Sequence, residues 1–142
     1  LPAMTRLRPA AYAIPGDITT LTGGYIYERR MLEGLRARGR DMRHLQLMDG
    51  FPAQSPGAEA DAIAQLAALE PDRPLILDGL VFGALDPRGM ARCRAPVVAM
   101  IHHPLAFESG LDAASRDRLY ATERANLAQA AHVLVPSPHT KR

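Results

Sequence analysis

Two kinds of residue in this sequence stand where their side chains or backbone could do chemistry. His102 and His103 directly follow the apolar run Val97–Ile101, and Gly23 and Gly24 lie between an earlier apolar run and an amphipathic segment. A histidine changes its charge near neutral pH and can hydrogen-bond a sugar hydroxyl or a phosphate oxygen. Two glycines let a ligand approach the backbone at the start of a helix, where free N–H groups favour an anion. Together these residue types favour a site for a phosphate-bearing ligand.

The glycine pair has several interpretations. A Walker A loop is excluded, because Gly24 is followed by YIYERR and not by a lysine and a serine or threonine. A dinucleotide fingerprint requires G-x-G-x-x-G, of which only GG is present, although Asp49 lies where a ribose-binding acid is expected. The pair could also form a plain tight turn, with Thr22 as the helix N-cap. A turn, a dinucleotide site and a phosphate site all stay open on the residues alone.

The two histidines also have alternatives. Adjacent side chains of an extended chain point to opposite sides, so His102 and His103 do not easily bind one metal ion, and we expect no metal site. A histidine that ends a buried parallel strand stands at the rim of a ligand crevice, or it caps a backbone carbonyl and is structural. Glu108 is either an acceptor for ligand hydroxyls or a solvated charge. We expect structural roles for His44 and His132 and a solvated helix face for the arginines of residues 28–40.

The elements that must position these residues alternate along the chain. The predicted strands are short runs of β type: Ala10–Ile14, Met42–Leu47, Leu75–Leu77, Val97–Ile101 and Val133–Val135. The predicted helices are Gly24–Arg38, Glu59–Leu69, Asp112–Ala131 and a short helix within Gly79–Met90. For the last long helix, the spacing predicts a buried face of Tyr120, Leu127 and Ala131. Strands joined by helix-length connections pair in parallel. The sequence therefore predicts an α/β fold, with an open, mostly parallel Rossmann-like sheet of about five strands and helices on both faces.

The composition narrows the possible classes of protein. With 142 residues, 47% of them hydrophobic, we expect a single domain over residues 1–142. The net charge of +2 is spread through the chain, which does not suggest a nucleic-acid surface. The single cysteine, Cys93, excludes an internal disulfide and fits a reducing compartment. No apolar run approaches the roughly 18 residues of a membrane span, so we expect a cytoplasmic protein without a transmembrane segment.

Four segments, in this order, resemble the N-terminal half of the family 4 glycosyltransferases. They are GGYIYERRMLEGLRARGRDMRHLQL, LILDGL, PVVAMIHHPLAFESGL and ATERANLAQAAHVLVPSPHT. Members of that family have the GT-B architecture of two facing Rossmann-like domains. A Gly-Gly pair opens their first helix, a histidine closes the fourth strand, and a glutamate-bearing helix leads to a strand that ends in a serine. Gly23, Gly24, His102, Glu123 and Ser137 match these positions.

The resemblance implies a retaining glycosyltransferase. Such an enzyme moves a sugar from a nucleotide-diphospho-sugar donor to an acceptor hydroxyl, and it needs no metal or other cofactor. The backbone at Gly23 and Gly24 would approach the donor diphosphate. His102 would be the catalytic contact to the sugar, with His103 as the alternative if the register shifts by one, and Ser137 would contact substrate. No carboxylate pair of the kind that glycosidases use is evident in the sequence.

The resemblance also implies that this chain is only the acceptor-side domain. The family continues beyond this point into a C-terminal domain that holds the donor. We therefore expect the chain to be inactive by itself, to need that missing domain, and to self-associate. The alternative is a stand-alone flavodoxin-like or receiver-like binding module. A receiver would need clustered acids after its first strand and a lysine after its last, whereas Asp17 stands alone and Lys141 lies several residues too far along.

Overall fold

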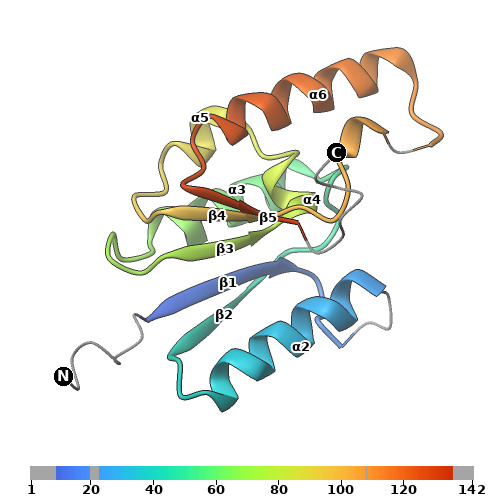
Figure 1. The fold of residues 1–142 in the computed structure, drawn as a ribbon. Helices are drawn as coiled ribbons and strands as arrows, with labels where there is room; N and C mark the ends of the chain where they lie inside the picture. The colour runs from blue at the N-terminus through green and yellow to red at the C-terminus, as the bar shows by residue number, and fades with distance from the viewer. Residues whose placement is uncertain (1–8, 20–22, 108, 136–142) are drawn as a thin grey trace.

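The protein is an α/β domain, shown in Figure 1 as a computed structural model that describes residues 9–19, 23–107 and 109–135. Its strands are β1 (Ala10–Pro15), β2 (Met42–Leu47), β3 (Leu75–Asp78), β4 (Val97–Met100) and β5 (His132–Leu134). Its helices are α2 (Gly23–Ala37), α3 (Pro56–Ala67), α4 (Gly79–Phe82), α5 (Pro87–Met90), the 3₁₀ turn η1 (Leu105–Phe107) and α6 (Ala113–Leu127). The predicted fold class is confirmed.

The strands form one open sheet in which every pairing is parallel. The order is β2-β1-β3-β4-β5, so the chain steps to one side of β1 for the second strand and to the other side for all later strands. The direction of winding therefore reverses beside β1. In open parallel sheets, ligands bind outside the carboxyl ends of the strands at such a reversal.

The reversal also decides which helices cover which face. Right-handed crossovers in opposite directions place their helices on opposite faces of a sheet. In Figure 1, α2 lies on one face, and α3, α4, α5 and α6 lie on the other. The side chains of β1 alternate accordingly: Ala11 and Ala13 pack in the core beneath the second group of helices, whereas Tyr12 and Ile14 pack with Leu32 of α2.

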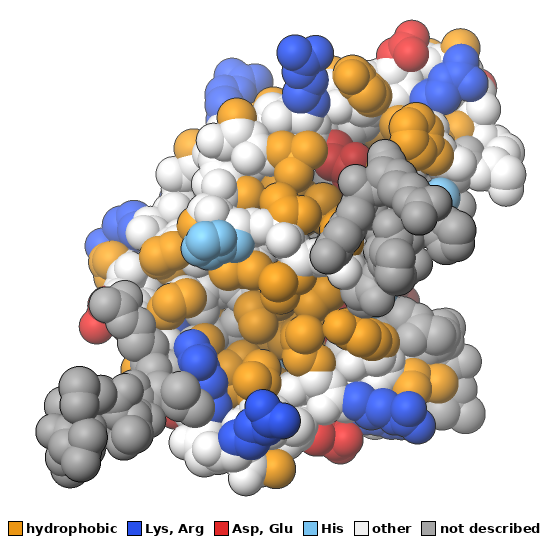
Figure 2. Space-filling view, viewed as in Figure 1, with side chains coloured by type: hydrophobic (Ala, Val, Ile, Leu, Met, Phe, Trp, Pro, Cys, Tyr) orange, Lys and Arg blue, Asp and Glu red, His pale blue; other side chains and the backbone are white. Residues whose placement is uncertain are grey.

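The α2 face of the sheet is only partly covered by the described residues. A groove of about 280 Å³ runs from α2 across the sheet to β5, and it is mostly apolar. Its walls include Met31 and Leu35 of α2 and Ile76, Val98 and Leu134 of the sheet. Figure 2 shows hydrophobic side chains gathered between α2 and α6. No helix in the described part of the chain has the length and apolar character to cross a membrane.

Local signals explain where the helices begin and end. Gly39 adopts a left-handed φ of +84° just after α2 and stops that helix, close to its predicted end at Arg38. Helix α3 begins earlier than predicted, because the Ser55 side chain accepts a hydrogen bond from the Ala58 N–H and Pro56 occupies the first turn. Asp112 caps α6 in the same way, by accepting from the Ser115 N–H at 2.7 Å.

The predicted buried face of α6 is wrong. Tyr120 is 55% exposed and Leu127 is also exposed, whereas Leu119, Glu123 and Asn126 are buried. The Asn126 side-chain amide donates to the carbonyl oxygens of Phe82, at 2.7 Å, and of Leu85, at 2.8 Å. Phe82 ends α4 and Leu85 follows in the turn after it, and their buried carbonyl oxygens need donors. Helix α6 therefore turns a polar residue inward, and its buried face differs from the one that apolar spacing predicts.

Candidate functional site

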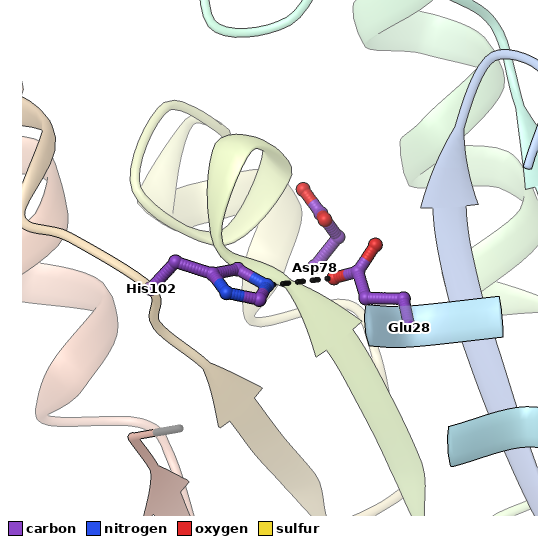
Figure 3. Close-up of side chains that lie close together, drawn as sticks. All are labelled: Glu28, Asp78 and His102. Carbon is purple, nitrogen blue, oxygen red and sulfur yellow. Dashed lines mark ion pairs between the residues drawn. The ribbon is translucent and has the colours of Figure 1, made fainter. Parts of the chain in front are cut away.

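Three polar side chains meet at the carboxyl edge of the sheet. Glu28 projects from α2, Asp78 is the last residue of β3, and His102 follows β4. Figure 3 shows Glu28 and His102 pointing toward one another, with Asp78 beside them. The strand topology brings these residues together, because β1, β3 and β4 are consecutive in the sheet and α2 begins at the same edge.

The three side chains are close enough to act as one group. The distance between His102 Nε2 and Glu28 Oε1 is 3.5 Å. One potential ligand atom from each of the three residues lies within 4.8 Å of the others. The His102 ring also meets the Tyr27 ring edge-to-face, with centroids 5.6 Å apart, which holds the imidazole in place.

Burial dominates the electrostatics of this cluster. Glu28 is fully buried and Asp78 is 3% exposed, and no arginine or lysine of the described residues forms an ion pair with either. Burial raises the pKa of Asp78 to about 9, and the neighbouring Glu28 carboxyl adds to the rise. Burial likewise raises the pKa of Glu28. Two carboxyls in this setting hold a proton or require a cation.

Two tyrosines border the carboxyls. The Tyr12 side chain is fully buried, and its hydroxyl lies beside the Glu28 carboxyl. Burial raises the pKa of Tyr12, with the charges of Glu28 and Asp78 contributing next. Tyr25 donates its hydroxyl hydrogen to the Pro15 carbonyl oxygen at 2.6 Å, and burial raises its pKa to about 12.

A glycine lets β3 and the start of α4 lie close to the end of β4. A Cβ atom at Gly79 would stand 2.7 Å from the Met100 carbonyl oxygen, so a side chain there would collide with backbone. Asp78, the residue before it, caps α4 by accepting from the Leu80 N–H at 2.8 Å. Asp78 is thereby fixed in orientation, with its remaining carboxylate capacity on the side of Glu28.

Some of the predicted site residues lie at or near this cluster, and others lie outside the described residues. Gly23 and Gly24 begin α2, a little over one turn before Glu28, and thus on the helix that contributes to the cluster. His102 is at the predicted edge, and its side chain is 32% exposed. His103 follows it and is exposed. The remaining predicted substrate contacts, Glu108 and Ser137, lie outside the described residues, as do Thr22 and Lys141.

The other predicted histidines stand apart from this cluster. His44 is half-buried on β2, where burial, and then the Arg36 charge, lower its pKa. His132 is exposed on the edge strand β5. Asp49, considered above for ribose binding, is exposed and accepts a hydrogen bond from the Gly50 N–H.

Sequence reasoning missed Tyr12, Glu28 and Asp78. Asp78 had a usable signal, since an acid directly after the buried run Leu75–Leu77 must stand at the carboxyl edge of a parallel sheet. Glu28 had none, because it lies within an arginine-rich segment typical of a solvated helix face. The sequence did not reveal that the fold brings the carboxyls of Glu28 and Asp78 together, buried and not across an open cleft as in glycosidases.

Comparisons with models of known protein families, with curated proteins and with solved structures found no match for this chain.

Proposed function

We propose that this chain is the acceptor-side domain of a retaining glycosyltransferase, which moves a sugar from a nucleotide-diphospho-sugar to an acceptor hydroxyl. The observation that carries the proposal is the position of His102 at the carboxyl edge of the sheet, 3.5 Å from Glu28 on the helix that Gly23 and Gly24 begin. A sugar contact and a diphosphate contact would then lie on neighbouring elements. The resemblance to family 4 glycosyltransferases supports the same assignment.

In this proposal the two halves of the donor have different contacts. The first N–H groups of α2 lack partners within the helix and carry its positive dipole end, which favours a diphosphate. His102, half-exposed and braced by Tyr27 and Glu28, would hydrogen-bond the transferring sugar as charge develops on it. Glu28 and Asp78 are too deeply buried to attack the sugar themselves. Their role would be to orient His102.

The proposal also covers the substrates, the cofactor, the need for a second domain and the compartment. The nucleotide-sugar and an acceptor of unspecified class are the substrates, and no cofactor takes part. The donor would be held mainly by a second domain, so these 142 residues alone would transfer no sugar. The thiol of Cys93 is free, which fits a reducing, cytoplasmic setting.

The test uses the natural protein that contains this chain. It is incubated with uridine, guanosine and adenosine diphosphate sugars, and release of nucleoside diphosphate and sugar transfer are measured. We expect turnover with one donor, and we expect His102→Ala to lower it by roughly a hundredfold or more while the denaturant midpoint barely moves. His103→Ala is the control for register, because adjacent side chains point in different directions. No turnover with any donor, or a fully active but destabilised His102→Ala variant, would overturn the proposal.

One observation favours a second candidate. The strand order β2-β1-β3-β4-β5 is the order of flavodoxin-like and receiver-like domains, which bind their ligand where the winding reverses. Asp17 does not add the acidic cluster of a receiver: it is exposed, and its carboxylate accepts from the Thr19 N–H and hydroxyl. Saturable quenching of flavin mononucleotide fluorescence by the chain would support the flavodoxin-like module instead.

A further inference from the structure

We propose that Glu123 is a positioning residue for His102: from α6 it holds the backbone of the loop that follows β4 and carries this histidine. The inference rests on the proposed function for its effect on sugar transfer. Its effect on the position of His102 belongs to the chain itself and can be measured without any substrate.

Glu123 is a buried carboxyl at the point where three elements meet. It is 8% exposed, and it accepts a hydrogen bond from the N–H of Leu105, the first residue of η1. Gly83 follows α4 directly, and a Cβ atom there would stand 2.9 Å from Glu123 Oε2 and 2.7 Å from Leu105 Cδ1. Helix α6, the loop after β4 and the end of α4 are therefore packed closely around this carboxyl.

Helix α6 gives Glu123 a fixed support. Three residues further along the helix, and thus on the same face, Asn126 donates to the carbonyl oxygens of Phe82, at 2.7 Å, and of Leu85, at 2.8 Å. These two hydrogen bonds tie α6 to the end of α4 and the turn after it. A hydrogen bond from the loop to Glu123 therefore anchors the loop to a rigid part of the fold.

His102 lies between two backbone anchors. Before it, the Ile101 N–H donates to a carbonyl oxygen of β5 at 2.9 Å. After it, the Leu105 N–H donates to Glu123. Pro104, between His102 and Leu105, has a fixed φ and restricts the conformation of the residue before it. Because this stretch is short and stiff, a shift of Leu105 is passed on to His102.

The contacts of His102 depend on its exact place. Its Nε2 lies 3.5 Å from Glu28 Oε1, and its ring meets the Tyr27 ring edge-to-face, with centroids 5.6 Å apart. Both partners belong to α2, whereas Glu123 holds the loop from α6, on the opposite face of the sheet. A misplacement of about 1 Å can cost a hundredfold in rate. Loss of the Glu123 anchor should therefore lower turnover without removing the group that contacts the sugar.

The test compares Glu123→Met with Glu123→Gln in the full chain. The two side chains are similar in size, but only glutamine offers the Leu105 N–H a strong acceptor. NMR spectra follow the ring protons of His102, whose chemical shifts depend on the Tyr27 ring beside them, and Tyr27→Leu identifies these signals. We expect Glu123→Met to move the signals toward their Tyr27→Leu positions, and Glu123→Gln to leave them near those of the unmodified chain.

Sugar transfer by the natural protein that contains this chain is the second readout. Glu123→Met should lower turnover by roughly tenfold or more, and Glu123→Gln should restore most of it. Asp117→Ala is the matched control, because it removes an exposed carboxylate from the same helix. It should change neither turnover nor the His102 signals.

The inference is overturned if the His102 signals stay unchanged in Glu123→Met, or if Glu123→Met and Glu123→Gln move them equally. Circular dichroism checks the fold of each variant, and Glu123→Ala, which adds no bulk, takes the place of Glu123→Met if that variant does not fold. Absence of turnover in every variant, together with the expected movement of the His102 signals, would count against the proposed function and would support this inference.

Discussion

At the scale of single residues, Asp78 links the fold to the site. Its carboxylate caps α4 through the Leu80 N–H and also lies beside the Glu28 carboxyl. The raised pKa of Asp78, about 9, arises first from burial and then from Glu28. A residue that ends a strand, starts a helix and holds a proton at neutral pH is tightly constrained. A substitution at Asp78 would therefore affect both the start of α4 and the buried cluster with Glu28.

Glu123 allows a prediction about pH. Burial raises its pKa above the ordinary value of 4.5, so the folded chain binds this proton more tightly than the unfolded chain does. The stability that the proton contributes is present at low pH and is lost as pH rises through the folded-state pKa. We expect Glu123→Gln to become progressively more stable, relative to the unmodified chain, as pH rises from 4.5 to 8.

Urea denaturation of both proteins across that pH range measures the difference. Asp117→Asn, an exposed change on the same helix, controls for the loss of one negative charge. An equal difference in unfolding free energy between the unmodified chain and Glu123→Gln at every pH would contradict the prediction.

At the scale of elements, two helical glycines should respond in opposite directions to the same change. Gly34 is exposed within α2, and a Cβ there would meet nothing within 4 Å. Gly34→Ala should therefore stabilise the chain by about 0.5–1 kcal/mol, because alanine loses less conformational freedom in a helix. Gly79→Ala should destabilise it by about 1–3 kcal/mol, since the new Cβ would press against the Met100 carbonyl oxygen at 2.7 Å.

Chemical denaturation of the two variants tests this pair of expectations. Each serves as the other's control, because both replace glycine by alanine within a helix. A Gly79→Ala variant as stable as the unmodified chain would show that the end of β4 yields easily to a side chain.

The elements show what a sequence can and cannot reveal. β2 runs from Met42 to Leu47 as predicted, because Gly39 before it and the Asp49–Gly50 turn signal after it bound the strand. The face of α6 was not predictable from apolar spacing, since Glu123 and Asn126 are turned inward for reasons of hydrogen bonding and packing. The same limit applies to the site: a position at the carboxyl edge was predictable for His102, but Glu28 is brought beside it only by the tertiary fold.

At the scale of the whole molecule, the uneven covering of the sheet is the dominant feature. Within the described residues, α2 is the one helix on its face, and the groove beside it exposes Ile76, Val98 and Leu134. Leu134, on the edge strand β5, is 39% exposed. Apolar surface next to an open sheet edge favours association.

We therefore predict that the chain self-associates through this face as its concentration rises. Light scattering should show a mass that approaches a dimer, and Leu134→Lys should shift the equilibrium toward monomer by roughly tenfold or more, because it places a charge in the apolar contact. Leu127→Lys is the control, since Leu127 is similarly exposed but lies on α6, across the sheet. A monomer at every concentration would contradict the prediction.

The two hydrogen bonds from Asn126 to the carbonyl oxygens of Phe82 and Leu85 can form only after the end of α6 has been synthesised. The donor follows its acceptors by 44 and 41 residues. At translation rates of roughly 5–20 residues per second, those carbonyls wait on the order of 2–9 s after their own synthesis. We expect the nascent chain to be most open to chaperones and proteases in that interval, and to close when the end of α6 leaves the ribosome.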